Sequence, residues 1–384
     1  MLAKFDPPLH LRSLLAPPGL PQAFPFDQPG CRLHFSGRYA LWAAIQALAL
    51  PRGAEVLLPS YSCGTEVEPF VRTGLAPRFY RVGGSLACDL EHLEGQLGQG
   101  RPRALLLTHY FGLPQPVSEV SELCAAHGVS LIEDCAHALL GEHRGRPLGS
   151  WGTLSVFSLI KSLPLPDGAV MLPGAALQGP PPPGEQPAPP SPAVHHLAGK
   201  LLRYNHPGTG RLAAGARYLL ERTLAARRRL SSRGLPPIDP RAAAFHPEAA
   251  GWTMSGLARR ILAATDLAEV KAARRRNFAA LLGELRRRRP GCLLVTELPE
   301  GACPLCLPVR LRRPAALFAR SLAGWGVEAV AWWDEFHPAV PWAEFPEAQA
   351  LKRRVLALPV HQGLSEADME RVACAFEATW RLLG

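Results

Sequence analysis

From about residue 31, short unbroken apolar runs alternate along the chain with helix-like segments. Apolar runs without polar alternation are typical of strands buried on both faces of a parallel sheet. This order of elements predicts an α/β fold, with a mainly parallel sheet covered by helices. The expected strands are Glu55–Ser60, Pro77–Val82, Arg103–Tyr110 and Val129–Asp134, and the expected helices are Ser36–Leu50, Gly64–Thr73 and Val117–Gly128.

The second half of the chain follows a different pattern. Residues 173–193 hold too much proline for a helix or an inner strand, so a surface loop or insertion is expected there. Helices are expected again from His195 to Ser232 and in one long stretch from Ser255 to Arg288. Strand-like runs and a final helix, Ser365–Leu383, then predict a smaller α+β unit, and Asp368 suits a capping box at the start of that helix.

These patterns divide the chain into three parts. We expect an N-terminal arm at residues 1–30, a large domain at 31–270 that includes the proline-rich loop, and a small C-terminal domain at 271–384. With 47% hydrophobic residues the chain can bury a sizeable core. No apolar run is long enough to cross a bilayer, and the proline-rich start lacks the cleavage site of a signal peptide. A cytoplasmic protein without a membrane partner is therefore expected.

Arginine runs stand out in a chain of formal net charge +10. They lie at Arg227–Arg229, Arg274–Arg276 and Arg286–Arg289. Such runs are either solvated helix faces or a source of attraction for an anionic substrate or nucleic acid. No nucleic-acid motif and no interleaved aromatic residues accompany them, so solvated faces are favoured and no nucleic-acid partner is expected.

Nine cysteines are scattered without the spacing of a disulfide framework. Cys303 and Cys306 form a lone CxxC in a strand-like stretch. A structural zinc site needs about four ligands, and a redox CxxC should open a helix, not lie in a strand-like stretch. We therefore expect reduced thiols and no metal.

The strongest chemical signal is an acid and an amine in neighbouring apolar segments. Asp134 closes one expected buried strand, and Lys161 closes the next apolar run, Thr153–Ile160. Burying a lone charge is costly unless a partner neutralises it. Pyridoxal 5'-phosphate would satisfy both, because a carboxylate holds its pyridinium nitrogen and a lysine forms a Schiff base with its aldehyde.

Several further motifs, in order, resemble those of fold-type-I pyridoxal-phosphate enzymes, and within them the DegT/StrS-type sugar aminotransferases. The likeness is strong from about residue 31 to 171 and again after 355. The motifs are SGRYAL (36–41), EVLLPSYS (55–62), THYFG (108–112), IEDCAHALLGEHRGRPLGSWG (132–152), FSLIK (157–161) and LALPVHQGLSEADMERV (356–372).

The resemblance assigns roles to individual residues. Gly37 and Arg38 open a helix whose free N–H groups would bind the cofactor phosphate, although a glycine before a helix is also common for structural reasons. Ser158 stands three residues before the lysine and would supply a phosphate-binding hydroxyl, a spacing shorter than these sugar aminotransferases usually have. His137 would lie near the ring, or be a structural histidine. Lys161 would also move the proton during the reaction.

Two departures from the family's pattern are visible. The position that usually holds a ring-stacking aromatic is Cys63, so Tyr61 is only a substitute if the loop differs. His109 and Tyr110 would line the substrate pocket, or merely pack. Residues 251–255 lack the Asn and Arg that usually precede Met-Ser, in a region that reaches the neighbouring subunit in relatives.

The resemblance implies a homodimeric aminotransferase. Glutamate would donate its amino group, and a keto group on a nucleotide-linked sugar, in surface polysaccharide or secondary-metabolite biosynthesis, would accept it. Two alternatives stay open: a pyridoxal-phosphate-dependent lyase or an aminotransferase for a non-sugar ketone, and a non-catalytic regulatory protein with the same fold. Retention of both Asp134 and Lys161 speaks against the last.

Overall fold

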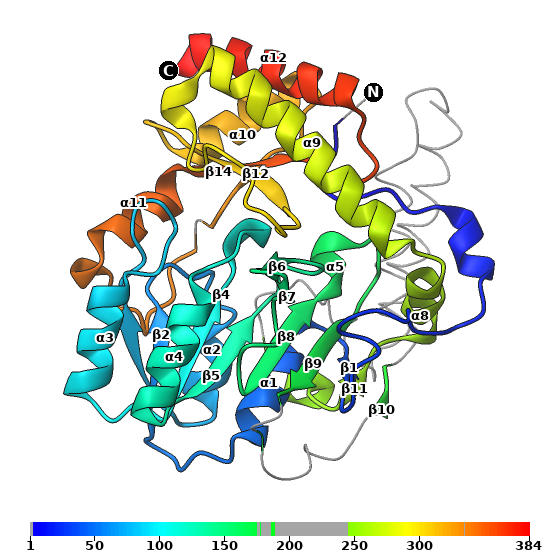
Figure 1. Ribbon diagram of the computed structural model, residues 1–384. Coiled ribbons are helices and arrows are strands. Elements are labelled where there is room, and N and C mark those ends of the chain that lie inside the picture. The colour runs from blue at the N-terminus through cyan, green and yellow to red at the C-terminus, as the bar shows by residue number, and fades with distance from the viewer. Residues whose placement is uncertain (1–2, 175–176, 178–185, 189–244, 334) are drawn as a thin grey trace, which may run out of the picture.

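The computed structural model describes residues 3–174, 177, 186–188, 245–333 and 335–384. Within these residues, a seven-stranded sheet and a three-stranded sheet form two layers of the molecule that lie one above the other in Figure 1. The helices expected from His195 to Ser232, and most of the proline-rich segment 173–193, lie outside the described residues.

The large sheet has the strand order β1-β9-β8-β5-β4-β2-β3. Its five strands from β8 to β3 are parallel, whereas β9 runs antiparallel to both β8 and β1. The strands that were expected as unbroken apolar runs are almost completely buried, as the apolar pattern requires. The bounds are β1 Arg32–His34, β2 Glu55–Pro59, β3 Ala76–Tyr80, β4 Ala104–Thr108, β5 Ser130–Asp134, β8 Leu154–Ser158 and β9 Ala169–Pro173.

Helices cover both faces of this sheet, with α3 and α4 in front of it and α1 behind it in Figure 1. The fold is that of the fold-type-I enzymes, as expected. Each predicted helix in this part of the chain is present, within a few residues of its expected bounds. The helices are α1 Gly37–Ala47, α2 Val67–Arg72, α3 Leu90–Gln99, α4 Val117–His127 and the single turn α5 Leu159–Ser162, with short 3-10 turns η1 Leu11–Leu15 and η2 Tyr110–Gly112.

The smaller, antiparallel sheet has the order β12-β14-β13 and packs with α9, α10 and α12 around a second hydrophobic cluster. At the start of α12, Ser365 and Asp368 form the predicted capping box. No helix among the described residues has the length and apolar character needed to cross a membrane. The elements are β12 Cys306–Arg310, α10 Ala315–Gly324, β13 Val330–Ala331, η5 Trp342–Glu344, α11 Pro346–Arg354, β14 Val355–Pro359 and α12 Glu366–Leu383.

The remaining short elements lie in the segments between the larger ones. They are β6 Glu142–His143 paired with β7 Arg146–Pro147, β10 Gln186–Pro187 paired with β11 Trp252–Thr253, η3 Pro247–Ala249 and η4 Pro290–Cys292. The domain boundary expected at residue 270 falls inside the first turn of α9 and stays a prediction.

The N-terminal arm is tied to the smaller sheet's side of the molecule. Ala3 forms a parallel bridge with Val327, and its N–H and carbonyl bond Gly326 and Glu328. The Phe5 N–H donates to a Glu328 carboxylate oxygen at 3.2 Å. This pairing directs residues 5 and 6 toward the space between the two sheets.

The single long helix expected from Ser255 to Arg288 was wrong. The structure has two helices, α8 Gly256–Ala263 and α9 Leu267–Arg288. The hydroxyl of Thr265 donates to the Ile261 carbonyl, and the Asp266 carboxylate accepts from the Glu269 N–H as an N-cap. These local bonds satisfy the backbone groups at the break, so the interruption costs little.

A second correction concerns Lys161. Strand β8 ends at Ser158, and Lys161 lies in the one-turn helix α5 that follows, not at the strand end. The neighbouring strands β5 and β8 are parallel, with Asp134 opposite Val156. Since both strands end at the same edge of the sheet, the acid and the amine are brought to one place.

Candidate active site

A cavity of about 460 Å³ opens at the carboxyl ends of β5 and β8, beside the N-terminus of α1. Its volume falls within the range typical of small-molecule sites, about 300–1,000 Å³. Six residues expected to hold the cofactor all line it: Gly37, Arg38, Asp134, His137, Ser158 and Lys161. The rest of the wall comes from the N-terminal arm, the loop after β2 and the segment around β13, including Phe5, Asp6, Cys63, Thr65, Glu66, Thr108, Trp332, Trp333 and Glu335.

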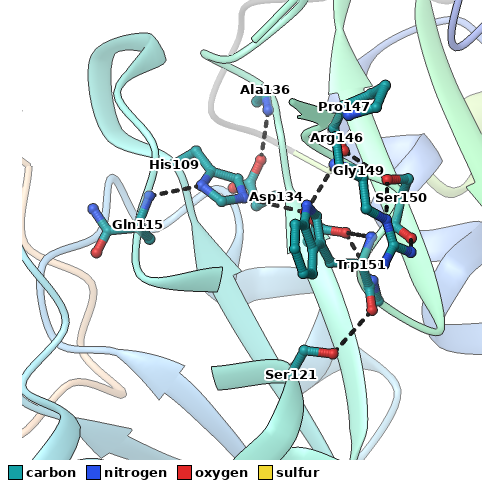
Figure 2. A network of polar contacts seen from close by, with 12 residues as sticks. His109, Gln115, Ser121, Asp134, Ala136, Arg146, Pro147, Gly149, Ser150 and Trp151 are labelled. Carbon is teal, nitrogen blue, oxygen red and sulfur yellow. Dashed lines mark hydrogen bonds and ion pairs between the residues drawn. The ribbon is translucent and has the colours of Figure 1, made fainter. Parts of the chain in front are cut away.

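Asp134 ends β5 with its side chain almost fully buried. One carboxylate oxygen accepts from the Ala136 N–H at 2.9 Å, as Figure 2 shows. Burial raises the pKa of Asp134 to about 6, helped by the negative Glu66 and opposed by the positive Lys161. A cationic N–H group bound beside it would keep the carboxylate ionised. The buried acid therefore fits the partner of a protonated ring nitrogen.

Lys161 and His137 form the closest polar pair in the cavity, with Nζ and Nε2 2.7 Å apart. The other ring nitrogen of His137, Nδ1, accepts from the Phe111 N–H at 3.2 Å. Burial first, and then the charge of Lys161, lower the pKa of His137 well below its usual value, so the ring is neutral. A neutral imidazole has one N–H.

The hydrogen bonds of His137 fix the orientation of its ring. Nδ1 faces the Phe111 N–H and Nε2 faces Lys161 Nζ, so the ring bridges the backbone and the amine. His137 thereby fixes the position of Lys161 Nζ in the cavity. A lysine positioned in this way can form a Schiff base with an aldehyde.

The N-terminus of α1 closes the opposite side of the cavity. A side-chain carbon at Gly37 would lie 3.1 Å from Cβ of Ser158, so any larger residue would force the helix end or Ser158 to shift by a few tenths of an ångström. Burial lowers the pKa of Arg38 from its usual value, a cost that a bound anion would offset. Free N–H groups, a guanidinium and the Ser158 hydroxyl together fit a phosphate group.

Two buried polar atoms on the cavity wall have no hydrogen-bond partner among the described residues: the Thr108 hydroxyl and the indole N–H of Trp332. Buried polar groups are normally paired. A bound molecule with polar edges would satisfy them. The wall thus carries an acid, an amine, an anion cradle and unpaired polar atoms, and these fit pyridoxal phosphate.

Tyr61, His109 and Tyr110 do not line the cavity. The hydroxyl of Tyr61 donates to the Trp332 carbonyl and that of Tyr110 donates to the Tyr61 carbonyl, each at 2.6 Å. Both rings are buried. The two tyrosines therefore pack behind the cavity wall. For Tyr110 this is the packing role that the sequence left open. Tyr61 does not replace the ring-stacking aromatic that is absent at Cys63.

His109 is held between two fixed groups behind Asp134. Its Nδ1 accepts from the Gln115 N–H at 3.1 Å, as Figure 2 shows, and its Nε2 donates to Glu133 at 3.3 Å. Cys135 lies near enough for a metal trio with them. However, the Glu133 carboxylate also accepts the N–H groups of residues 149, 151 and 152, so its lone pairs are already used.

The aromatic surface of the site comes from a part of the chain that the sequence did not single out. The rings of Trp332 and Trp333 lie 5.2 and 5.6 Å from the His137 ring, and Phe5 lies 5.6 Å from Trp332. Adjacent tryptophans after an apolar run are a readable signal of a buried or binding surface. Their position opposite His137 depends on the packing of the two sheets.

Cys63, at the family's aromatic position, has a defined polar role. Its thiol donates to Glu66 at 2.5 Å, and its N–H donates to the other oxygen of the same carboxylate at 2.9 Å. Burial and the Glu66 charge raise the pKa of the thiol to about 12. Glu66 was not anticipated, and it brings a second carboxylate into the cavity beside Asp134.

The residues matched by known proteins centre on this cavity. Residues 34–168 match the DegT/DnrJ/EryC1/StrS aminotransferase family. GDP-perosamine synthase from Vibrio cholerae is 30% identical over 134 residues, which are 35% of this chain and 36% of that protein. A UDP-N-acetyl-3-dehydro-alpha-D-glucosamine 3-aminotransferase from Acidithiobacillus ferrooxidans is 31% identical over 33% of this chain and 34% of its own length.

The likeness in structure extends further than the likeness in sequence. The crystal structure of the aminotransferase TlmJ from Streptoalloteichus hindustanus covers 100% of both chains with a TM-score of 0.67, at 21% identity. The sequence match spans about a third of each curated relative. Residues 34–168 are thus similar to the DegT/DnrJ/EryC1/StrS aminotransferase family, and the fold of the chain is similar to that of the aminotransferase TlmJ.

Proposed function

We propose that this protein is a pyridoxal-phosphate-dependent aminotransferase. The observation that carries the proposal is the Lys161 amine, held 2.7 Å from His137 Nε2 in the same cavity as the buried Asp134. When bound, pyridoxal phosphate supplies an electron sink for the substrate's carbon–hydrogen bond. A non-catalytic relative would have no need to keep a positioned amine in one cavity with a buried acid.

Each cavity residue has a proposed role in holding the cofactor or moving the proton. Asp134 would hold the protonated ring nitrogen, and the N-terminus of α1 with Arg38 and Ser158 would bind the phosphate. His137 fixes the position of Lys161 Nζ, which would take the proton from the substrate carbon and return it at the neighbouring position. Trp332, Trp333 and Phe5 exclude water from this side of the cavity.

The acceptor we propose is a keto group on a nucleotide-linked sugar, and the donor is glutamate. Support for the acceptor comes from the two curated relatives, whose names describe a GDP-linked and a UDP-linked sugar. Glutamate would leave its amino group on the cofactor and depart as 2-oxoglutarate, so the two half-reactions balance. We further propose a cytoplasmic homodimer, in which the neighbouring subunit completes the acceptor side.

The donor half-reaction tests the proposal. The purified protein, reconstituted with pyridoxal phosphate, should release about one equivalent of 2-oxoglutarate per subunit from glutamate. Lys161→Ala should lose both this release and the visible absorbance of the bound cofactor. Lys271→Ala is the matched control, because Lys271 lies outside the cavity and pairs with Glu142.

Two results would count against the proposal. Consumption of an amino acid without release of its keto acid would favour a lyase. Visible absorbance and turnover that survive in Lys161→Ala would remove the basis of the proposed chemistry.

A further inference from the structure

A second concave surface lies at the far end of the smaller sheet and shares no residue with the candidate active site. It encloses about 590 Å³. Five arginines, Trp380 and the turn Pro290–Cys292 contribute to it. The arginines are Arg288, Arg289, Arg310, Arg312 and Arg354.

Three separate segments bring these arginines together. Arg288 ends α9 and Arg289 follows it, within one of the arginine runs seen in the sequence. Arg310 ends β12, and Arg354 immediately precedes β14, in which Val355 pairs with Arg310. The Leu311 N–H donates to the Arg354 carbonyl at 2.8 Å, which holds the chain at Arg312 against Arg354.

The end of α9 is joined to the same edge by two contacts. Leu293, just after the turn η4, bridges to Val309 of β12. Arg289 bonds Glu377 of α12 at 2.8 Å, and its guanidinium lies 5.8 Å from the Trp380 ring. In Figure 1 the C-terminal ends of α9 and α12 accordingly lie together. The cluster is therefore a product of tertiary packing and not of one solvated helix face.

Carboxylates balance only part of this charge. Arg288 pairs with Glu284 at 3.0 Å and Arg289 pairs with Glu377. Arg310, Arg312 and Arg354 have exposed side chains and no ion pair with any residue that the structure describes. Three unneutralised guanidinium groups around one hollow repel one another and attract an anion.

We propose that this surface, which we call the arginine pocket, binds a small molecule that carries two or more phosphate groups. Guanidinium groups bind phosphate oxygens in pairs, with a geometry that carboxylates share but single halide ions do not. One phosphate would leave most of a cavity of this size empty, whereas a diphosphate can engage arginines from both the α9 side and the β12–β14 side. The proposal does not depend on aminotransferase activity.

Inorganic pyrophosphate and ADP are the probes, and calorimetry on the full chain at 50 mM and 150 mM salt is the measurement. The variant Arg310→Gln/Arg312→Gln/Arg354→Gln removes the three unpaired charges. The matched control, Arg101→Gln/Arg103→Gln/Arg320→Gln, removes three exposed arginines outside the pocket. Thermal unfolding of both variants checks that they are folded.

We expect saturable binding of both probes to the parent protein and to the control, and a loss of at least about tenfold in affinity in the pocket variant. Equal affinities of the parent protein for pyrophosphate and for ADP would mean that the pocket recognises the diphosphate alone. Tighter binding of ADP than of pyrophosphate would mean that the pocket also contacts the nucleoside. Equal losses in both variants, citrate binding as tight as pyrophosphate, or binding only to a nucleic-acid oligomer would each overturn the proposal.

Discussion

Lys161 Nζ lies 2.7 Å from Nε2 of His137, and the opposite nitrogen of that ring already accepts the Phe111 N–H. The imidazole is thereby held between a backbone N–H and the lysine amine. A lysine that forms a Schiff base must be held in reach of the aldehyde. Here a backbone N–H acts through the imidazole to fix the position of the amine.

This relationship predicts the effect of substituting His137. In His137→Phe a ring is kept but the hydrogen bond to Lys161 Nζ is lost, so the amine loses a positioning contact worth about 0.5–1.5 kcal/mol. The rate at which the apoprotein captures pyridoxal phosphate should fall by about two- to tenfold. Stopped-flow absorbance of cofactor capture by the apoprotein measures this.

His137→Gln is the informative comparison, because its amide can still form a hydrogen bond with the lysine. Its rate of cofactor capture should lie closer to that of the parent protein. If His137→Phe captures the cofactor as fast as the parent protein, the hydrogen bond does not position the amine.

The buried Asp134 predicts a pH-dependent stability of the apoprotein. Its pKa is about 6 in the folded protein against 3.8 for the free group, so the folded state binds more protons between these values. The contribution of Asp134 to the free energy of unfolding should therefore be fully present below about pH 4. It should be lost as the pH rises through about 6, by an amount on the order of 3 kcal/mol.

Asp134→Asn removes this titration while keeping an acceptor for the Ala136 N–H. Urea unfolding of the apoprotein at pH 4 to 8 gives the free energy of unfolding of both proteins. The value for the variant should rise relative to that of the parent protein as the pH increases, and the difference should level off above pH 7. Cofactor affinity should fall in the same variant, because the ring nitrogen loses its counter-charge. A gain in the stability of the variant that is independent of pH would contradict this account.

Gly37 should tolerate no side chain. In Gly37→Ala the added carbon lies 3.1 Å from Cβ of Ser158, so α1 must move away from β8 and its N–H groups from the phosphate site. We expect a loss of at least about tenfold in cofactor affinity, and destabilisation by about 1–3 kcal/mol, typical of overpacking. Fluorescence titration with pyridoxal phosphate and thermal unfolding measure the two effects.

Gly283→Ala provides the control for Gly37→Ala. Gly283 lies within α9, and a side-chain carbon there would contact nothing within 4 Å. Alanine should stabilise this helix by about 0.5–1 kcal/mol without changing cofactor affinity. If Gly37→Ala bound pyridoxal phosphate as tightly as the parent protein does, the N-terminus of α1 would not be part of the phosphate site.

Cys63 should resist alkylation. Its pKa of about 12 keeps it a thiol at pH 8, and the thiol is not the nucleophile. Cys374 is exposed and serves as the internal reference. Peptide mass spectrometry after iodoacetamide treatment of the apoprotein should find Cys374 modified and Cys63 unmodified. Glu66→Gln removes the neighbouring charge, so Cys63 should then become more reactive.

Local patterns were sufficient to predict most parallel strands of the large sheet and the buried acid at the end of one of them. Buried parallel strands have unbroken apolar sequences, and a carboxylate buried at the end of one of them needs a partner, so Asp134 could be found from its position alone. Helix α3 was missed although its signals were readable, since Asp89 caps it and Leu90, Leu93 and Leu97 follow helical spacing. The break at Asp266 was readable in the same way.

The rest of the site could not be read from local patterns. Trp332 and Trp333 meet His137 only because the smaller sheet packs above the larger one, and no periodicity records that contact. The same holds for the arginine pocket, where Arg310 and Arg354 become neighbours through strand pairing. For Cys63, the sequence showed that it stands at the family's aromatic position. Its hydrogen-bond partner, Glu66, could be identified only from the conformation of the loop.

The N-terminal arm has a practical consequence for anyone who handles this protein. Ala3 forms a β-bridge with Val327, and Phe5 forms part of the cavity wall. Removal of residues 3–8 should leave both sheets in place and expose this side of the cavity to solvent. The arm should therefore be kept when the protein is shortened for study.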